Sequence, residues 1–316
     1  MVPKKGLEGY SMGDDVKRLG EEIRQLSQER KAVILAHVYQ RDEVQAIAHH
    51  TGDSLALSRI AVDIDADVIV LCGVRFMAET AEILNPDKIV LLPARDAGCP
   101  LADMATVTAL RAKKAAYPEA AVVSYVNSSA AIKAESDICC TSSNAVKIVN
   151  SMAEEQVIFV PDRNLGRYVA GKTEKHVILW PGFCPVHNYK ITAANIRRIQ
   201  ADHPDARVMV HPECPPDVIA LADFVGSTAQ MLEYTANTSA NEYVVGTERG
   251  LLYELTQSNP DKTFYSPSED IICEDMKKIT LAKVARALQA MRYEIQVPES
   301  VRVKAKRALD RMLEVK

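Results

Sequence analysis

The 316-residue sequence has no excess of positive charge and no long apolar run. Its 38 lysines and arginines are outnumbered by 42 aspartates and glutamates, which gives a net charge of −4. The basic footprint that nucleic-acid-binding proteins carry is therefore missing. No apolar stretch reaches the roughly 18 residues of a membrane helix, and no signal-peptide pattern follows the N-terminal residues. We expect a cytoplasmic protein that binds neither nucleic acid nor membrane.

The sequence also lacks the cysteine patterns of disulfide scaffolds and zinc fingers. Seven cysteines, an odd number, argue for reduced thiols, and no two of them are separated by just two residues. Four cysteines stand outside the repeat described next, and we expect them to be small buried side chains: Cys72, Cys139, Cys140 and Cys214.

What the sequence does contain is an internal repeat with a period of about 85 to 89 residues. Each copy has an apolar run ending in a polar pair, then a hydroxyl residue after 17 positions, then a cysteine after another 42 to 45. The polar pairs are His37-x-Tyr39, Tyr125-x-Asn127 and His211-x-Glu213. The hydroxyl residues are Ser54, Ser142 and Thr228, and the cysteines are Cys99, Cys184 and Cys273. Three copies predict three equivalent units around one centre.

Each copy has the pattern of an α/β unit. Nearly continuous apolar runs predict strands covered on both faces at 32–36, 67–71, 89–92, 121–125, 157–160, 177–180, 207–210, 242–245 and 263–265. Crossover helices are expected between them, for example at 54–64, 76–84, 145–152, 229–235 and 250–257, with Thr106, Thr192 and Thr280 capping the helix that closes each copy. We therefore predict three homologous three-layer α/β/α sandwich domains in a pseudo-threefold arrangement around a central active site.

The repeat sets the expected domain boundaries. The first α/β repeat, which includes an N-terminal helix, spans 14–117, the second 118–203 and the third 204–297. Residues 298–316 are expected to form an amphipathic C-terminal helix, and residues 1–13 an untethered arm.

The polar positions of the repeat predict a binding site. Parallel sheets bind ligands beyond the carboxyl ends of their strands, where His37, Tyr125 and His211 are expected. Hydroxyl residues that open the next helix lie beside unpaired backbone N–H groups, which favour anions. A single such residue is better explained as a simple helix cap. Three in register favour a ligand with several negative groups.

The three repeated cysteines come from separate loops that the repeat would gather at the centre. Three thiolates can hold three corners of a 4Fe-4S cluster and leave one iron free to act as a Lewis acid. A zinc ion with the same thiolates and a water is the rival interpretation, and three buried structural cysteines are the third.

Four segments resemble the quinolinate synthase family: GVRFMAET at 73–80, WPGFCPVH at 180–187, HPECP at 211–215 and MKKIT at 276–280. The resemblance covers roughly residues 16–295. It implies a triplicated α/β fold, one 4Fe-4S cluster on three cysteines, and condensation of iminoaspartate with dihydroxyacetone phosphate to quinolinate, phosphate and water in de novo NAD biosynthesis. It also implies an aspartate-oxidising enzyme as the candidate supplier of iminoaspartate.

Carried over by motif, the resemblance assigns residue roles. The cluster ligands are Cys99, Cys184 and Cys273. The substrate contacts are His37, Ser54, Tyr125, Asn127, Ser142, His211, Glu213 and Thr228, and the expected acids and bases are Glu213, Tyr39 and His211. Two departures from the family pattern are Leu101, where methionine is common, and the absence of a second cysteine three residues from Cys273.

Several assignments stay open. His187 and Lys190 either line the entrance or are exposed, and Asp96 is a further candidate near Cys99. A hydro-lyase would use the same cluster without phosphate chemistry, and a non-catalytic iron-sulfur sensor would not need the three hydroxyls. A radical enzyme that cleaves S-adenosylmethionine is disfavoured, since its tight local group of three cysteines is absent.

Overall fold

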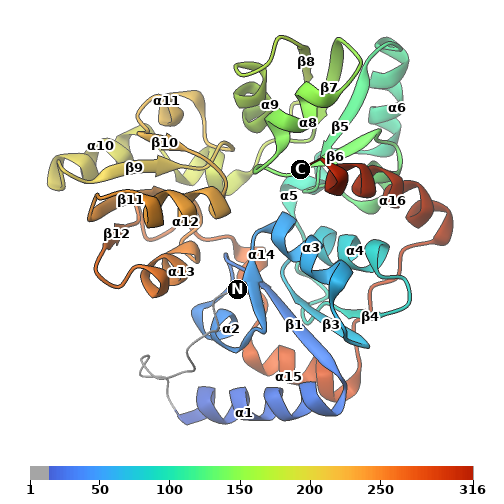
Figure 1. Cartoon of the computed structure of the whole chain (residues 1–316), viewed down its shortest axis with the longest axis vertical. Helices are drawn as coiled ribbons and strands as arrows, with labels where there is room; N and C mark the ends of the chain where they lie inside the picture. Colours follow the sequence, from blue (N-terminus) through green and yellow to red (C-terminus); the bar gives the residue numbers. More distant parts are fainter. Residues whose placement is uncertain (1–13, 316) are drawn as a thin grey trace.

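A computed structural model describes residues 14–315, and its strands form three separate sheets in three lobes (Figure 1). Each sheet has four parallel strands in the same order: β2-β1-β3-β4, β6-β5-β7-β8 and β10-β9-β11-β12. The first strand of each unit therefore lies between its second and third. The predicted α/β class and its threefold repetition along the chain are confirmed. The expected arm at residues 1–13 lies outside the described residues.

The first sheet is built from β1 (Ala32–His37), β2 (His50–Gly52), β3 (Val68–Cys72) and β4 (Ile89–Leu91). Its segment of the chain also contains α1 (Asp14–Glu29), α2 (Asp42–Ile47), α3 (Ser54–Asp63), α4 (Arg75–Leu84) and α5 (Pro100–Asp103). All five residues of β3 are buried, as expected for a central parallel strand covered on both faces.

The second sheet contains β5 (Ala121–Tyr125), β6 (Ile138–Cys140), β7 (Gln156–Val160) and β8 (His176–Leu179). Its helices are α6 (Val107–Ala116), α7 (Ala130–Ala134), α8 (Ala145–Ser151), α9 (Arg163–Ala170) and the π-helix η1 (Val186–Lys190). π-helical turns are rare and often occur at functional sites. The presence of η1 therefore indicates that the segment after Cys184 is a candidate functional segment.

The third sheet contains β9 (Arg207–Val210), β10 (Phe224–Val225), β11 (Glu242–Gly246) and β12 (Thr263–Tyr265). The remaining helices are α10 (Ala193–Asp202), α11 (Pro216–Ile219), α12 (Thr228–Asn237), α13 (Leu251–Ser258), α14 (Glu274–Lys277), α15 (Leu281–Ala290) and α16 (Glu299–Glu314). The predicted strands are all present, with ends that differ by at most one residue.

The sequence patterns missed the short second strand of each unit, β2, β6 and β10. These strands have only two or three residues and lie at a sheet edge, where they need no long apolar run. His50, Thr51 and Gly52 illustrate the problem, because none of them is fully buried.

Three helices that the sequence repeat assigned to the end of one unit pack on the next unit instead. Leu110 of α6 packs with Val122 and Ile158 of the second sheet. Ile196 of α10 packs with Val208 of the third. The helix α15 then returns to α1 and β3 of the first unit, as Figure 1 shows at the bottom of the molecule. The capping roles predicted for Thr106, Thr192 and Thr280 are confirmed, since each side chain accepts a backbone N–H three residues later.

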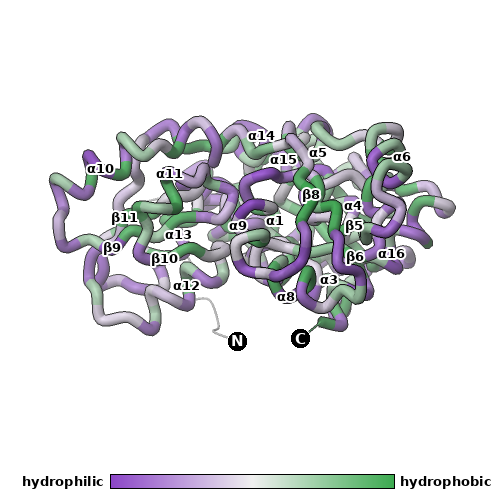
Figure 2. Tube along the Cα trace, turned by 90° about the horizontal axis from the view of Figure 1, so that it is seen from above, coloured by the Kyte–Doolittle hydropathy of each residue, from purple (hydrophilic) through white to green (hydrophobic). Residues whose placement is uncertain are grey.

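The C-terminal helix α16 joins the first two units. It packs on α7 and β6 of the second unit and on α4 of the first. Ala308, Leu309 and Met312 are buried along this face, and burying a leucine or methionine stabilises a fold by roughly 1.5–3 kcal/mol. Figure 2 shows the flattened body from above, with apolar residues running along the strands. No helix among residues 14–315 has the length and apolar character to cross a membrane.

Candidate active site

One pocket is lined by side chains from all three units. It brings together all twelve residues that the sequence predicted for the site: His37, Tyr39, Ser54, Cys99, Tyr125, Asn127, Ser142, Cys184, His211, Glu213, Thr228 and Cys273. As expected, His37 and Tyr125 end their strands β1 and β5, and His211 directly follows β9. The carboxyl ends of the three sheets therefore share a single cavity.

The two histidines at strand ends are held in the same local geometry. Nδ1 of His37 accepts a hydrogen bond from the backbone N–H of Tyr39 at 3.1 Å. Nδ1 of His211 likewise accepts from the N–H of Glu213 at 3.3 Å. Because Nδ1 is the acceptor, the neutral ring carries its proton on Nε2. In His211, Nε2 lies 3.2 Å from Oγ of Ser142 inside the pocket.

Burial keeps both imidazoles neutral. It lowers the pKa of His37 to about 3, with Lys277 lowering it further and Glu213 opposing the shift. It also lowers the pKa of His211 to about 3, against the opposing effect of Glu213. Each ring can then offer a neutral Nε2–H donor to a ligand.

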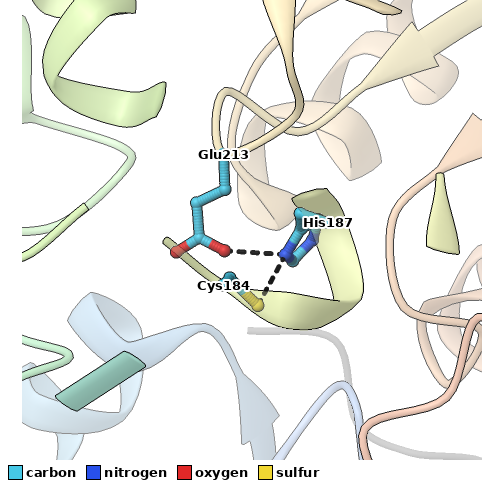
Figure 3. A group of neighbouring side chains, drawn as sticks. All are labelled: Cys184, His187 and Glu213. Carbon is cyan, nitrogen blue, oxygen red and sulfur yellow. Dashed lines mark hydrogen bonds and ion pairs between the residues drawn. The ribbon is translucent and has the colours of Figure 1, made fainter. Parts of the chain in front are cut away.

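His187 is a central residue of the pocket and not a surface residue. Its Nδ1 lies 2.7 Å from Oε2 of Glu213 and 3.3 Å from Sγ of Cys184 (Figure 3). Its side chain is only 3% exposed, and the π-helix η1 turns it inward. The alternative of an exposed His187 is therefore wrong.

Thr247 connects His187 with Tyr39. Its Oγ1 lies 2.9 Å from Nε2 of His187 and 2.5 Å from the hydroxyl of Tyr39. Gly250 lets this loop approach Tyr39, because a Cβ at that position would come within 2.7 Å of the Tyr39 backbone carbon. Sequence reasoning missed Thr247. No pattern marked it, because the equivalent positions directly after β3 and β7 are Gly73 and Pro161.

Glu213 is a buried carboxylate that its neighbours keep ionised. Burial alone raises its pKa, but the charge and hydrogen bond of His187, the charge of His211 and a hydrogen bond with Tyr125 outweigh it and lower the pKa to about 2. The carboxylate therefore stays charged in the pocket, where it can stabilise a positive charge on His187.

The structure differs from the prediction at one of the three hydroxyl residues. Ser54 and Thr228 are the first residues of α3 and α12, as expected. Ser142 does not open a helix, because α8 begins only at Ala145 and Thr141–Asn144 form a turn. The hydrogen bond from the N–H of Thr141 to Oδ1 of Asn144 stabilises this turn.

The pocket can bind anions with neutral donors. No lysine or arginine is found among the residues that line it within the described chain. Oδ1 of Asn127 is buried without a hydrogen-bond partner in the described residues. Such an unsatisfied group in a cavity indicates a polar ligand.

The three repeated cysteines lie in loops that reach the same pocket. Burial raises the pKa of each thiol, to about 11 for Cys273, while backbone N–H groups of the following turn oppose the shift. Cys99 and Cys273 both raise the pKa of Cys184, as neighbouring thiolates would. The other four cysteines are fully buried, as predicted.

Two buried carboxylates hold the cysteine loops. Oδ2 of Asp162 accepts the backbone N–H of Cys184 at 3.1 Å, and Oε1 of Glu248 accepts that of Cys273 at 3.0 Å. Burial raises the pKa of both carboxyl groups. The equivalent position in the first unit is Val74, so Cys99 lacks this support.

The donor atoms permit two kinds of metal site. Cys184, His187 and Glu213 offer ligand atoms that all lie within 4.8 Å of one another. Within residues 14–315 the three cysteines do not form such a compact group. A zinc ion with Zn–S bonds of about 2.3 Å would need its thiolates closer together than that, whereas a cubane separates its ligands widely. The three thiols of the described chain therefore lack the compact arrangement of a single-ion site.

Two further candidates lie outside the pocket. The ammonium of Lys190 donates to the backbone carbonyl of Ile272 at 2.9 Å. Asp96 is exposed, and its carboxylate lies 3.8 Å from the ammonium of Lys278. Neither side chain lines the site.

Comparison with known proteins gives one consistent result. A family model described as "Quinolinate synthetase A protein" matches residues 21–314. A curated relative from Geobacter metallireducens, "Quinolinate synthase", is 55% identical over 93% of this chain and 97% of its own length. "Quinolinate synthase 2" from Methanosarcina acetivorans is 52% identical over 94% of this chain and 96% of its own. "Quinolinate synthase" from Alkaliphilus metalliredigens is 52% identical over 94% and 98%.

Proposed function

The chain belongs to the quinolinate synthase family, and we propose that it condenses iminoaspartate with dihydroxyacetone phosphate to quinolinate, phosphate and water. This reaction would be its contribution to de novo NAD biosynthesis. One observation carries the proposal: three thiols and the polar strand ends of three sheets line the same pocket.

We assign Cys99, Cys184 and Cys273 as the ligands of one 4Fe-4S cluster. Soft thiolates suit iron-sulfur clusters, and the three cysteines line one pocket without forming, among the described residues, the compact group that a single ion needs. When bound, the cluster would supply a Lewis acid at the iron that no cysteine holds. Asp162 and Glu248 support this assignment because they fix the loops of two ligands.

The neutral donors of the pocket would hold the substrates. Iminoaspartate carries two carboxylates and dihydroxyacetone phosphate a phosphate, so the ligands are rich in acceptors. The Nε2–H groups of His37 and His211 and the hydroxyls of Ser54, Ser142 and Thr228 can donate to them, with Asn127 and Tyr125 beside them. The starts of α3 and α12 add the positive ends of two helix dipoles.

Tyr39, Thr247 and His187 would move protons during ring closure. The Glu213 carboxylate only accepts, so Nδ1 of His187 donates to it and Nε2 accepts from Thr247. Thr247 has a single proton to give, and therefore Tyr39 donates to Thr247. When a substrate acid gives a proton to the Tyr39 oxygen, Tyr39 would pass its own proton to Thr247 and Thr247 would pass one to Nε2 of His187. Glu213 would stabilise the positive charge that His187 then carries. His211 remains our candidate for a second acid near the substrate.

A single metal ion at Cys184, His187 and Glu213 is the rival cofactor arrangement, because their donor atoms converge. It would leave Cys99 and Cys273 without a role. It would also occupy Nδ1 of His187 and interrupt the hydrogen bond to Glu213, so we favour the cluster.

The repeat supports a finer description of the architecture. We propose three homologous three-layer α/β/α domains at 14–117, 118–203 and 204–297, with the helix 298–316 added, in a pseudo-threefold arrangement about the pocket. The identical strand order of the sheets supports it. We place the reaction in the cytoplasm, where thiols stay reduced, with an aspartate-oxidising enzyme as the source of iminoaspartate.

Anaerobic purification tests the proposal directly. We expect near four irons and four sulfides per chain and quinolinate from the two substrates. Near-stoichiometric zinc without sulfide would favour the single-ion site. Turnover of a hydroxy acid without any phosphate requirement would favour a hydro-lyase. A cluster-loaded protein that makes no product and tolerates Ser142→Ala would point to a sensor.

A further inference from the structure

One hydroxyl group links all three units beneath the pocket. Oγ of Ser143 lies 2.8 Å from Oδ2 of Asp53 and 2.8 Å from Oγ of Ser227. Asp53 precedes α3 of the first unit, Ser143 precedes α8 of the second and Ser227 precedes α12 of the third. Figure 1 shows these helices in three different lobes.

The hydrogen bonds have a definite direction. The Asp53 carboxylate can only accept, so Ser143 donates its one proton to Asp53 and accepts from Ser227. A second contact comes from Gln230, whose Nε2 donates to the backbone carbonyl of Ser143 at 3.4 Å.

Both partners of Ser143 are fixed by their own helices. The other carboxylate oxygen of Asp53 accepts the N–H of Ala56, and Oγ of Ser227 accepts the N–H of Gln230 in a capping box. Ser227 is fully buried and Asp53 is 8% exposed. The Ser143 hydroxyl therefore connects two rigid helix starts with a turn that has no helix of its own at that point.

Each of the three linked residues is the immediate neighbour of a pocket hydroxyl. Asp53 precedes Ser54, Ser143 follows Ser142, and Ser227 precedes Thr228. We propose that Ser143 is a positioning residue that sets the distances among these three hydroxyls, and thereby the spacing of anionic groups that the pocket accepts. This proposal rests on the proposed function, because it assigns the hydroxyls to substrate binding.

The chemical steps should depend little on Ser143. The chain of Tyr39, Thr247 and His187 involves none of the atoms that Ser143 contacts. Loss of the link would leave Tyr39, Thr247 and His187 in place. It would loosen the hydroxyl groups that bind carboxylate and phosphate, among them Ser142, which also contacts His211. Substrate affinity should change more than turnover.

Ser143→Ala in the cluster-loaded protein tests this role, with KM for both substrates, kcat, and the Kd of quinolinate by calorimetry. We expect KM and Kd to rise roughly five- to thirtyfold, as for one or two lost hydrogen bonds, while kcat stays within about threefold. Ser143→Thr should restore most of the affinity. Ser136→Ala is the matched control, because its hydroxyl donates to the carbonyl of Ile132 in α7, the helix just before it in the same unit.

Ser227→Ala provides a second break of the same link. If the two residues act through one contact, the double variant should weaken quinolinate binding by less than the product of the single effects. Unchanged KM and Kd in Ser143→Ala, or fully multiplicative effects, would overturn the proposal. If the wild type makes and binds no quinolinate, the proposed function fails, and the affinity for inorganic phosphate alone then decides whether Ser143 positions the hydroxyls.

Discussion

The hydroxyl of Tyr39 lies 2.5 Å from Oγ1 of Thr247, although 208 residues separate the two in the sequence. Tyr39 follows β1 of the first sheet and Thr247 follows β11 of the third. Nε2 of His187, from the second unit, lies 2.9 Å from the same Oγ1 of Thr247. One hydrogen-bonded chain therefore needs all three units in place.

Thr247→Val removes the hydroxyl and keeps the side-chain volume. We expect kcat for quinolinate formation to fall by about 10²–10⁴, because Tyr39 and His187 lose the group that connects their protons. Thr247→Ser should restore much of the rate. Iron and sulfide contents should match the wild type. An unaffected kcat in Thr247→Val would exclude this chain from the reaction.

Glu213→Gln removes the negative charge next to His187 at nearly constant volume. We expect a loss of at least about 10² in kcat/KM, because a positive charge on His187 is no longer stabilised 2.7 Å away. Glu269→Gln, a change at an exposed carboxylate, is the control. The idea would be abandoned if both variants showed the same steady-state kinetics as the wild type.

Replacing Cys99, Cys184 or Cys273 by serine should abolish cluster retention, because each would remove one of three protein ligands. The measurement is the iron and sulfide content of anaerobically prepared protein, with its visible spectrum. Cys72→Ala, at a fully buried thiol outside the pocket, should retain both elements. Full iron and sulfide in any of the three serine variants would contradict the assigned ligand.

The lowered pKa values of His37 and His211 predict a pH dependence of stability. Each folded-state pKa is about 3 against an ordinary value of 6.5, so the unfolded chain binds more protons in between. Each histidine should therefore make the free energy of unfolding decrease as pH falls from about 6.5 towards 3, by up to about 1.4 kcal/mol per pH unit.

Urea unfolding of the wild type and of His211→Gln at pH 7, 6 and 5 measures this effect. The variant should show the shallower pH dependence, by about one proton, since it lacks one buried imidazole. His37→Gln should behave in the same way. Parallel pH profiles for all three proteins would show that these rings do not resist protonation in the folded state.

The repeat made the fold and most of the pocket predictable, because it marked equivalent positions in three units. His37 and Tyr125 end apolar strands and His211 directly follows one, and this pattern is visible in the sequence. Thr247 and the inward direction of His187 were not predictable in the same way. Thr247 lies in a loop whose equivalents have different side chains, and His187 faces the pocket because a π-helix changes its direction.

The turn before α8 illustrates the same limit. The spacing of 17 residues correctly placed Ser142 in the pocket, yet it also suggested a helix start there. Spacing along the chain determines which residues meet. The conformation of the two residues between Ser142 and α8 depends instead on local hydrogen bonds such as the one between Thr141 and Asn144.

The helix α15 of the third unit packs against α1 and β3 of the first, so the last unit of the chain contacts the first. In each unit, one helix that follows the preceding copy in the chain, or the third copy in the case of the first unit, packs on the unit. A fragment that ends after two copies would therefore leave the first sheet uncovered on the side where α15 lies.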